Sequence, residues 1–116
     1  MRVTRQMVYD RVKKHLLDQN VRSVDGTGRC MYRGPEGRMC ALGCLIPDSR
    51  YAPSLEAFGS PYSSEIQMAI FGRPTTNLGG AMMRLLKYLQ AIHDYSFPSR
   101  WEDQLHGVAC QEGLTP

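Results

Sequence analysis

The chain has 116 residues, of which 42% are apolar and 22% charged, and its formal net charge is +3. This length suits one domain with a single hydrophobic core, which we place over residues 1–116, and the composition excludes a disordered chain. The sequence has no apolar run as long as a transmembrane helix and no signal peptide, so we expect a cytoplasmic protein without a membrane partner. The positive charge permits an anionic partner but excludes a dedicated DNA-coating protein.

Apolar residues repeat with helical spacing in the first half of the chain. A first helix is predicted to begin after the N-cap Thr4 and to end near Gln19. A second helix is predicted to begin at Ser60 and Pro61, because an N-cap followed by proline favours a helix start. Gly72 is the expected C-terminal stop of this second helix.

Two longer helices are predicted in the second half. The third begins at Thr75 or Thr76 and carries a 4-3-4-3 spacing of apolar residues through position 92. The fourth begins at the N-cap Ser99, where Glu102 completes a capping box, and it ends at Gly113.

The segment between the first two helices predicts a small β-hairpin. Two strands are expected at residues 29–33 and 38–42, joined by a turn in which Pro35 presets φ and Gly37 accepts a positive φ. A two-stranded ribbon is marginal alone, so it must pack on helices. A single helical turn is expected at residues 53–57. The predicted fold class is therefore α+β, with about four helices packed with one small antiparallel hairpin in a single compact domain.

Three of the four cysteines lie close together in the sequence, which suggests a zinc site. The expected ligands would be Cys30, Cys40 and Cys44, with a fourth from His93, His15 or Cys110. The spacing differs from the paired C-x2-C pattern that zinc sites favour. The alternative is that these cysteines are small buried core side chains.

A thiol nucleophile is a second possibility for the same residues. Cys40 or Cys44 would be activated by His93, which lies on the flank of the third helix. Asp94 is adjacent to His93 in the sequence, so we expect its side chain to point elsewhere. A catalytic triad would then lack a carboxylate to orient the histidine. The cysteine and histidine still define an alternative function, a cysteine- and histidine-dependent hydrolase or transferase.

The hairpin also suggests recognition of an anion. Arg33 and Arg38 could bind phosphate or carboxylate groups, and Tyr32 beside them could stack on a base. Thr76 and Gly79 lie at the start of the third helix, where free backbone N–H groups could bind the anion and the glycine would let it approach the backbone closely. The alternative is that these are solvated arginines and a glycine that admits a packed neighbour.

One block of the sequence resembles a known group of proteins. The block reads Cys30-x-Tyr32-Arg33-x3-Gly37-x2-Cys40-Ala41-x-Gly43-x-Leu45-Ile46-Pro47-Asp48. It is similar to a block in small phage- and prophage-associated proteins with no assigned activity, and the likeness continues through residues 51–53, 85–94 and 101–105. The resemblance implies a small accessory protein of a mobile element, located in the cytoplasm of a bacterial host cell.

Together these observations predict a non-enzymatic binding protein, for which inhibition of bacterial immunity is one fitting role. Its expected partner is an anionic nucleotide signal or a nucleic-acid-handling host protein complex, with no cofactor. The expected ligand-binding residues are Tyr32, Arg33, Arg38, Thr76 and Gly79. The alternatives that remain open are the cysteine-dependent enzyme and a small structural zinc-binding domain.

Overall fold

Four α-helices form the framework of the protein. The computed structural model describes residues 3–59, 61, 63–72 and 79–116. The helices are α1 (Arg5–Gln19), α2 (Ser64–Phe71), α3 (Gly80–Tyr95) and α4 (Trp101–Glu112). None of the helices in these described ranges has the length and apolarity that a membrane crossing requires.

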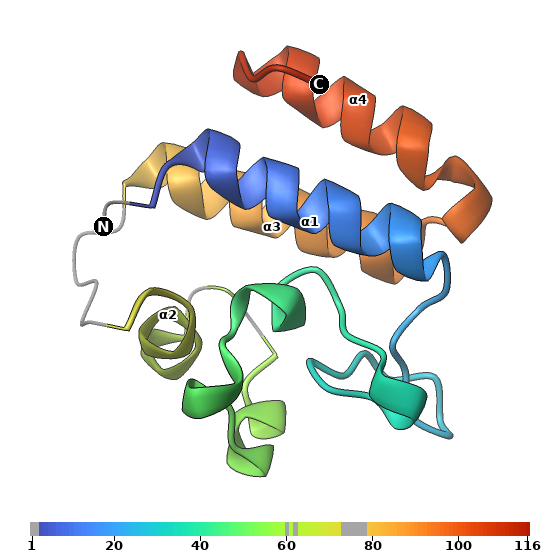
Figure 1. The fold of residues 1–116 in the computed structure, drawn as a ribbon, viewed down its shortest axis with the longest axis vertical. Coiled ribbons are helices and arrows are strands. Elements are labelled where there is room, and N and C mark those ends of the chain that lie inside the picture. Colours follow the sequence, from blue (N-terminus) through green and yellow to red (C-terminus); the bar gives the residue numbers. More distant parts are fainter. Residues whose placement is uncertain (1–2, 60, 62, 73–78) are drawn as a thin grey trace.

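The three longer helices pack on one another and enclose most of the core. α1 lies along α3, and α4 packs across both of them, while α2 and the chain between α1 and α2 lie on the other side of this layer (Figure 1). The largest fully buried side chain is Trp101 at the start of α4, and its indole N–H donates to the carbonyl of Ile92 on α3. This bond fixes the corner at which α3 turns into α4.

The predicted α+β class is wrong for this chain. The structure is 64% helical, and the described residues contain no β-strand. In the described part of the chain, the two expected strands are joined by one isolated bridge, between Arg33 and Met39. A second isolated bridge joins Cys30 to Val24, which lies outside both expected strands. The protein is all-α, with irregular chain where the two strands were expected.

Short 3-10 turns replace the hairpin and continue beyond it. Their bounds are Pro35–Gly37, Gly43–Leu45, Asp48–Arg50, Pro53–Ala57 and, before α4, Pro98–Arg100. The turn predicted at residues 53–57 is thereby confirmed. Gly37 adopts a φ of 73°, as expected of the glycine in the first of these turns.

Several predicted helix ends are confirmed. The hydroxyl of Thr4 accepts a hydrogen bond from the N–H of Met7, which caps α1, and α1 ends at Gln19. Gly72 and Gly113 follow α2 and α4 with φ of 73° and 71°, the left-handed conformation that glycine adopts without strain.

Three predicted helix starts differ from the structure. α2 begins at Ser64 with Ser63 as its cap, later than predicted; Ser60 lies outside the described residues. The predicted cap Thr76 also lies outside them, and Gly79 is the N-cap of α3. No capping box forms at Ser99, because that residue lies in the 3-10 turn preceding α4.

Arginine side chains hold the irregular segments to the helices and to one another. Guanidinium N–H groups donate to backbone carbonyls in pairs that include Arg11 with Cys44, Arg22 with Ser96, Arg29 with Glu56, Arg33 with Ile46, and Arg50 with both Ala69 and Ile70. Chain without regular structure must satisfy its carbonyls in some other way, and here long cationic side chains do so. Much of the positive charge of the chain is thereby used within the fold.

Candidate functional site

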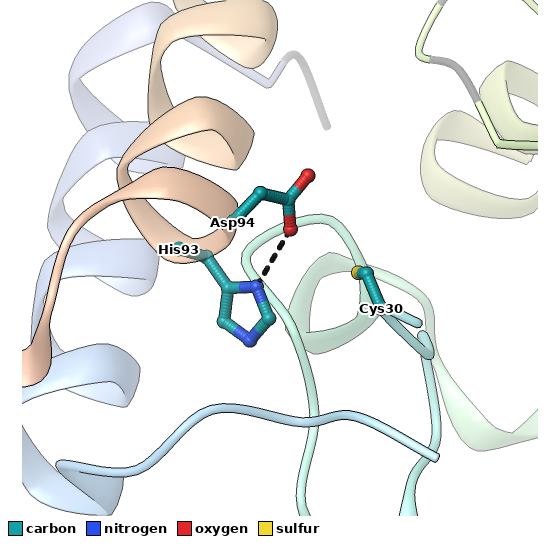
Figure 2. A group of neighbouring side chains, drawn as sticks. All are labelled: Cys30, His93 and Asp94. Atoms are coloured by element: carbon teal, nitrogen blue, oxygen red, sulfur yellow. Dashed lines mark hydrogen bonds and ion pairs between the residues drawn. The ribbon is translucent and has the colours of Figure 1, made fainter. Parts of the chain in front are cut away.

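A polar cluster lies where the C-terminal half of α3 meets the loop after α1. Figure 2 shows three of its members, Cys30 from the loop and His93 and Asp94 from α3. One potential ligand atom from each residue lies within 4.8 Å of the other two. His93 is fully buried, while Cys30 and Asp94 are partly exposed, so this cluster is the first candidate for chemistry.

Gln90, one turn before Asp94 on α3, connects this cluster to two other segments. Its carbonyl oxygen accepts the N–H of Leu42 at 2.9 Å. Its amide nitrogen donates to Asp94 Oδ1 at 2.9 Å and to Cys30 Sγ at 3.1 Å. Because the amide uses both its acceptor and its donors, Gln90 fixes the loop, the 40–44 segment and the Asp94 carboxylate against α3.

The hydrogen bonds of His93 define its tautomer. The backbone N–H of Ser23 lies 2.9 Å from Nε2 and can only donate, so Nε2 must accept and the ring proton must lie on Nδ1. Nδ1 therefore donates to Asp94 Oδ1, at 2.9 Å. The prediction that the Asp94 side chain points away from His93 is therefore wrong.

The environment of His93 affects its charge in opposing ways. Burial lowers the pKa of His93, whereas the hydrogen bonds with Asp94 and Cys30 raise it, and the net shift is upward. A second proton would have to occupy Nε2, where the Ser23 N–H points. Protonation of His93 would therefore break the Ser23 hydrogen bond.

This arrangement does not provide a general base for catalysis. A base must offer a free lone pair to the proton it removes, and the lone pair on Nε2 is already used by Ser23. The predicted pairing of His93 with Cys40 or Cys44 is not seen. The Cys44 thiol donates to the carbonyl of Ala41 at 3.0 Å. Cys40 Sγ accepts the N–H of Gly43 at 3.3 Å.

The thiols are also poorly prepared as nucleophiles. A hydrogen bond with Cys40, together with burial, raises the pKa of the Cys30 thiol far above its usual range. Burial raises the pKa of Cys44 to about 12, and the nearby Arg11 offsets this only in part. Since the thiolate is the reactive form, a raised pKa makes both thiols poor nucleophiles at neutral pH.

The predicted zinc ligands are only partly brought together. Cys30 and His93 meet, and Asp94 joins them, but Cys44 lies on the side of the chain that faces α1 and Arg11. An ion bound by His93 would need Nδ1, which carries a proton, or Nε2, which accepts from Ser23. The donor set therefore fits a hydrogen-bonded junction better than a tetrahedral metal centre.

The residues predicted to bind an anion are largely used within the fold. The Arg33 guanidinium donates to Asp48 at 2.7 Å and to the carbonyl of Ile46 at 2.6 Å, and it lies over the Tyr51 ring, 4.9 Å from its centroid. Tyr32 is buried, and its hydroxyl donates to the carbonyl of Phe58. These two side chains cannot reach a ligand without leaving those contacts.

Arg38, Gly79 and Thr76 are the other residues that were predicted to bind an anion. Arg38 forms an exposed ion pair with Glu36 at 2.9 Å. Gly79 caps the opposite end of α3 from the loop, and the helical rise of about 1.5 Å per residue puts it roughly 16 Å from Gln90 along the axis. Thr76 lies outside the described residues. The structure does not assemble Gly79 with the arginines into one site.

A different surface lies beside the polar cluster, at the corner between α3 and α4. Tyr95 and Phe97 are 84% and 71% exposed, the highest values for large hydrophobic residues in the described ranges. The Arg22 guanidinium lies over the Phe97 ring, 5.5 Å from its centroid, and donates to the carbonyl of Ser96 at 2.9 Å. We call Arg22, Asp94, Tyr95 and Phe97 the corner surface.

A hollow of about 230 Å³ opens on this surface. It is lined by Arg22, Val24, Gly28, Cys30, His93, Asp94 and Tyr95. A second hollow of about 170 Å³ lies beside it and shares Cys30 and Asp94. Sequence reasoning missed the corner surface, although two aromatic residues directly after an amphipathic helix and outside its apolar stripe were the available signal.

A wider groove runs along α1. It has a volume of about 560 Å³, with Met7 and Met39 among its apolar residues and Lys14 and Asp18 among its charged ones. Lys14 and Asp18 pair with each other at 2.8 Å. The charges along this groove are mixed and already partly paired, so they do not indicate one kind of occupant.

Comparisons with known proteins do not extend this description. No protein-family model, curated protein or solved structure matches the chain.

Proposed function

We propose that this protein is a small, non-enzymatic accessory protein that acts by binding another protein through the corner surface. The observation that carries the proposal is the exposure of Tyr95 and Phe97 around Arg22. Aromatic residues and arginine are the side chains that contribute most to protein interfaces. Large aromatic side chains left in water are otherwise unfavourable, and a partner that covers them removes that cost.

The internal use of the arginines favours a protein over a nucleotide as the partner. Arg33 and Tyr32, the strongest predicted contacts for an anionic nucleotide, are held by Asp48, Ile46 and Phe58. The corner surface instead combines two apolar rings with one cation and one carboxylate. Such a mixture suits a polypeptide, which offers apolar and charged groups of both signs.

The resemblance of the 30–48 block to small phage- and prophage-associated proteins supports the biological setting. An accessory protein of a mobile element in a bacterial cell would act on a host protein complex, and inhibition of immunity is one such role. The buried thiols and the engaged His93 support a binding function over the cysteine-dependent alternative.

Site-specific photocrosslinking tests the proposal. A benzophenone amino acid placed at Phe97 should form a covalent adduct of one defined mass in bacterial cells. The matched control is the same amino acid at Gln111, which is also exposed but lies at the far end of α4. The adduct should disappear when Tyr95→Ser is added to the Phe97 probe. Absence of any adduct at Phe97, or the same adduct at Gln111, would overturn the proposal.

A further inference from the structure

Asp94 carries an oxygen that the fold does not use. Oδ1 accepts both from Gln90 at 2.9 Å and from His93 at 2.9 Å. Oδ2 has no hydrogen-bond partner among the described residues, and in Figure 2 it points away from the His93 ring. The side chain of Asp94 is 26% exposed and borders both hollows of the corner surface. A carboxylate oxygen without a partner, on a fixed residue that lines a hollow, is a ready acceptor for a donor from outside.

The surroundings of this oxygen favour a cation. α3 ends at Tyr95, and the C-terminal end of a helix carries a partial negative charge. The Tyr95 ring lines the same hollow and is almost fully exposed, so its face can receive a cation. The carboxylate and the aromatic ring therefore both favour a cation, whereas the Ser96 carbonyl at the helix end is already bonded by Arg22.

The protein already contains a version of this arrangement in which the cation is present. The Arg33 guanidinium lies between the Asp48 carboxylate, at 2.7 Å, and the ring of Tyr51. Arginine is the cation that binds a carboxylate with a planar fork and stacks on an aromatic face at the same time. The corner surface offers the same pair, a carboxylate and a tyrosine ring, without a guanidinium between them.

The charged groups around the hollow are compatible with a guest cation. Arg22 is the cation on its wall, but its guanidinium is held over Phe97 and bonded to the Ser96 carbonyl at the end of α3. Both ring nitrogens of His93 in the wall are already engaged, by Ser23 and by Asp94. The hollow has a volume of about 230 Å³, whereas sites for whole small molecules typically have about 300–1,000 Å³. Its small volume suits a single side chain.

We propose that the hollow of the corner surface receives an arginine side chain of the partner protein, with its guanidinium on Asp94 Oδ2 and against the Tyr95 ring. This inference rests on the proposed function and specifies the chemistry of the partner. Arg22 and Phe97 would contact the peptide on either side of that arginine. The partner segment is therefore basic at the position that enters the hollow.

A titration followed by the backbone amide signals in NMR spectra tests this inference without knowledge of the partner. The probe is the peptide acetyl-Gly-Arg-Gly-amide, and its matched control contains citrulline, which has nearly the same shape but no charge. The arginine peptide should give saturable shifts at Gly28 and at residues 94–97, and the citrulline peptide should bind at least fivefold more weakly. Asp94→Asn, which keeps an acceptor for His93 and Gln90, should lower the affinity for the arginine peptide by a similar factor.

Two further variants complete the experiment. Tyr95→Ala, which alters only an exposed ring, should also weaken binding, whereas Asp103→Asn, which removes an exposed carboxylate on α4, should leave it unchanged. Equal shifts with both peptides, or no saturable shift with either, would overturn the inference. If the Phe97 crosslink forms while the arginine peptide fails to bind, only the inference about arginine fails; if both are negative, the proposed function fails with it.

Discussion

The backbone N–H of Ser23 donates a hydrogen bond to His93 Nε2 across 70 residues of sequence, at a distance of 2.9 Å. Both residues are fully buried. This bond attaches the loop after α1 to the last turn of α3, and the Asp94 carboxylate fixes the imidazole from its other side. His93 therefore joins Gln90, which bonds Cys30, and Arg22, which bonds Ser96, in positioning this loop.

Replacement of His93 by alanine should destabilise the protein by about 2–4 kcal/mol. The change leaves the Ser23 N–H buried without an acceptor. It also removes a ring that stacks on Trp101, with the two ring centroids 5.8 Å apart. Chemical denaturation measures the effect. The control is His106→Ala, because His106 is exposed on α4 and its loss should change the free energy of unfolding by less than about 0.5 kcal/mol. Similar small effects for both variants would contradict the role assigned to the Ser23 bond.

Gly43 makes a backbone contact that excludes any larger residue. A Cβ atom at this position would lie 2.0 Å from the carbonyl oxygen of Tyr32, and backbone cannot move aside as a flexible side chain can. Gly43→Ala should therefore cost about 2 kcal/mol or more, measured as a loss of stability in denaturant.

The matched control for Gly43 is another glycine of this chain. Gly107 lies inside α4, and a Cβ there would meet no atom within 4 Å. Gly107→Ala should stabilise the protein by about 0.4–1 kcal/mol, because alanine favours the helix. If Gly43→Ala left the stability unchanged or raised it, as Gly107→Ala should, the close approach of Gly43 to Tyr32 would not be present in solution.

The helices could be predicted from sequence because local signals determine them. Apolar spacing together with Thr4 and Gly113 located the ends of α1 and α4, since caps and periodicity act within a few residues. The start of α4 was misplaced, because Ser99 has the sequence of a capping box but the 3-10 turn before the helix takes that position.

The hairpin prediction failed because the backbone of residues 29–42 is satisfied from far along the chain. The N–H groups of Tyr32 and Arg33 donate to the Glu56 carboxylate at 2.9 and 3.0 Å, in place of a partner strand. The N–H of Met39 donates to Gln19, and that of Leu42 to Gln90, both at 2.9 Å. Such pairings have no local signature, so a turn between apolar runs was interpreted as a ribbon.

The candidate site could likewise be predicted from the sequence only in part. The sequence drew attention to Cys30 and His93, but it assigned Asp94 away from His93 on the rule that adjacent helical side chains diverge. Both side chains are long enough to bend toward each other at the last turn of α3, where the bond is observed. The corner surface was missed because the exposure of Tyr95 and Phe97 depends on how α3 turns into α4, and two aromatic residues outside the apolar stripe were the available local signal.

Glu112 should make the stability of the protein depend on pH. Its carboxylate accepts from Arg84 at 3.0 Å and from Arg5 at 2.7 Å, and so joins the end of α4 to α3 and α1. The hydrogen bond from Arg84, supported by the charges of both arginines, lowers the pKa of Glu112 below its usual value. A lowered pKa in the folded state means that this contribution is present above the ordinary glutamate pKa and is lost as the pH falls through the folded-state value.

Glu112→Gln should therefore lower the free energy of unfolding by about 1–2 kcal/mol at pH 7, a range that allows for the partial exposure of Arg84. The difference from the wild type should shrink as the pH falls below about 4, because the wild-type carboxylate then also becomes neutral. Urea titrations at pH 7 and pH 3 make the comparison. A difference that stayed constant between these two pH values would show that charge is not its cause.

The four cysteines should differ sharply in reactivity toward an aromatic disulfide reagent. Cys110 is exposed on α4, whereas Cys40 and Cys44 are buried and Cys30 is partly covered. The hydrogen bond with Cys40, together with burial, raises the pKa of the Cys30 thiol, and burial raises the pKa of Cys44 to about 12. We expect one thiol to react rapidly at pH 8 and the other three to react only as the protein unfolds, with denaturant accelerating them.

Cys110→Ser is the variant that decides the assignment of the fast thiol. It should remove the rapid phase completely and leave the stability unchanged, because the Cys110 side chain is exposed. A rapid phase that persisted in Cys110→Ser would show an activated thiolate among Cys30, Cys40 and Cys44. That result would restore the cysteine-dependent hydrolase or transferase as the better account of the polar cluster, since a free thiolate beside His93 is what such an enzyme requires.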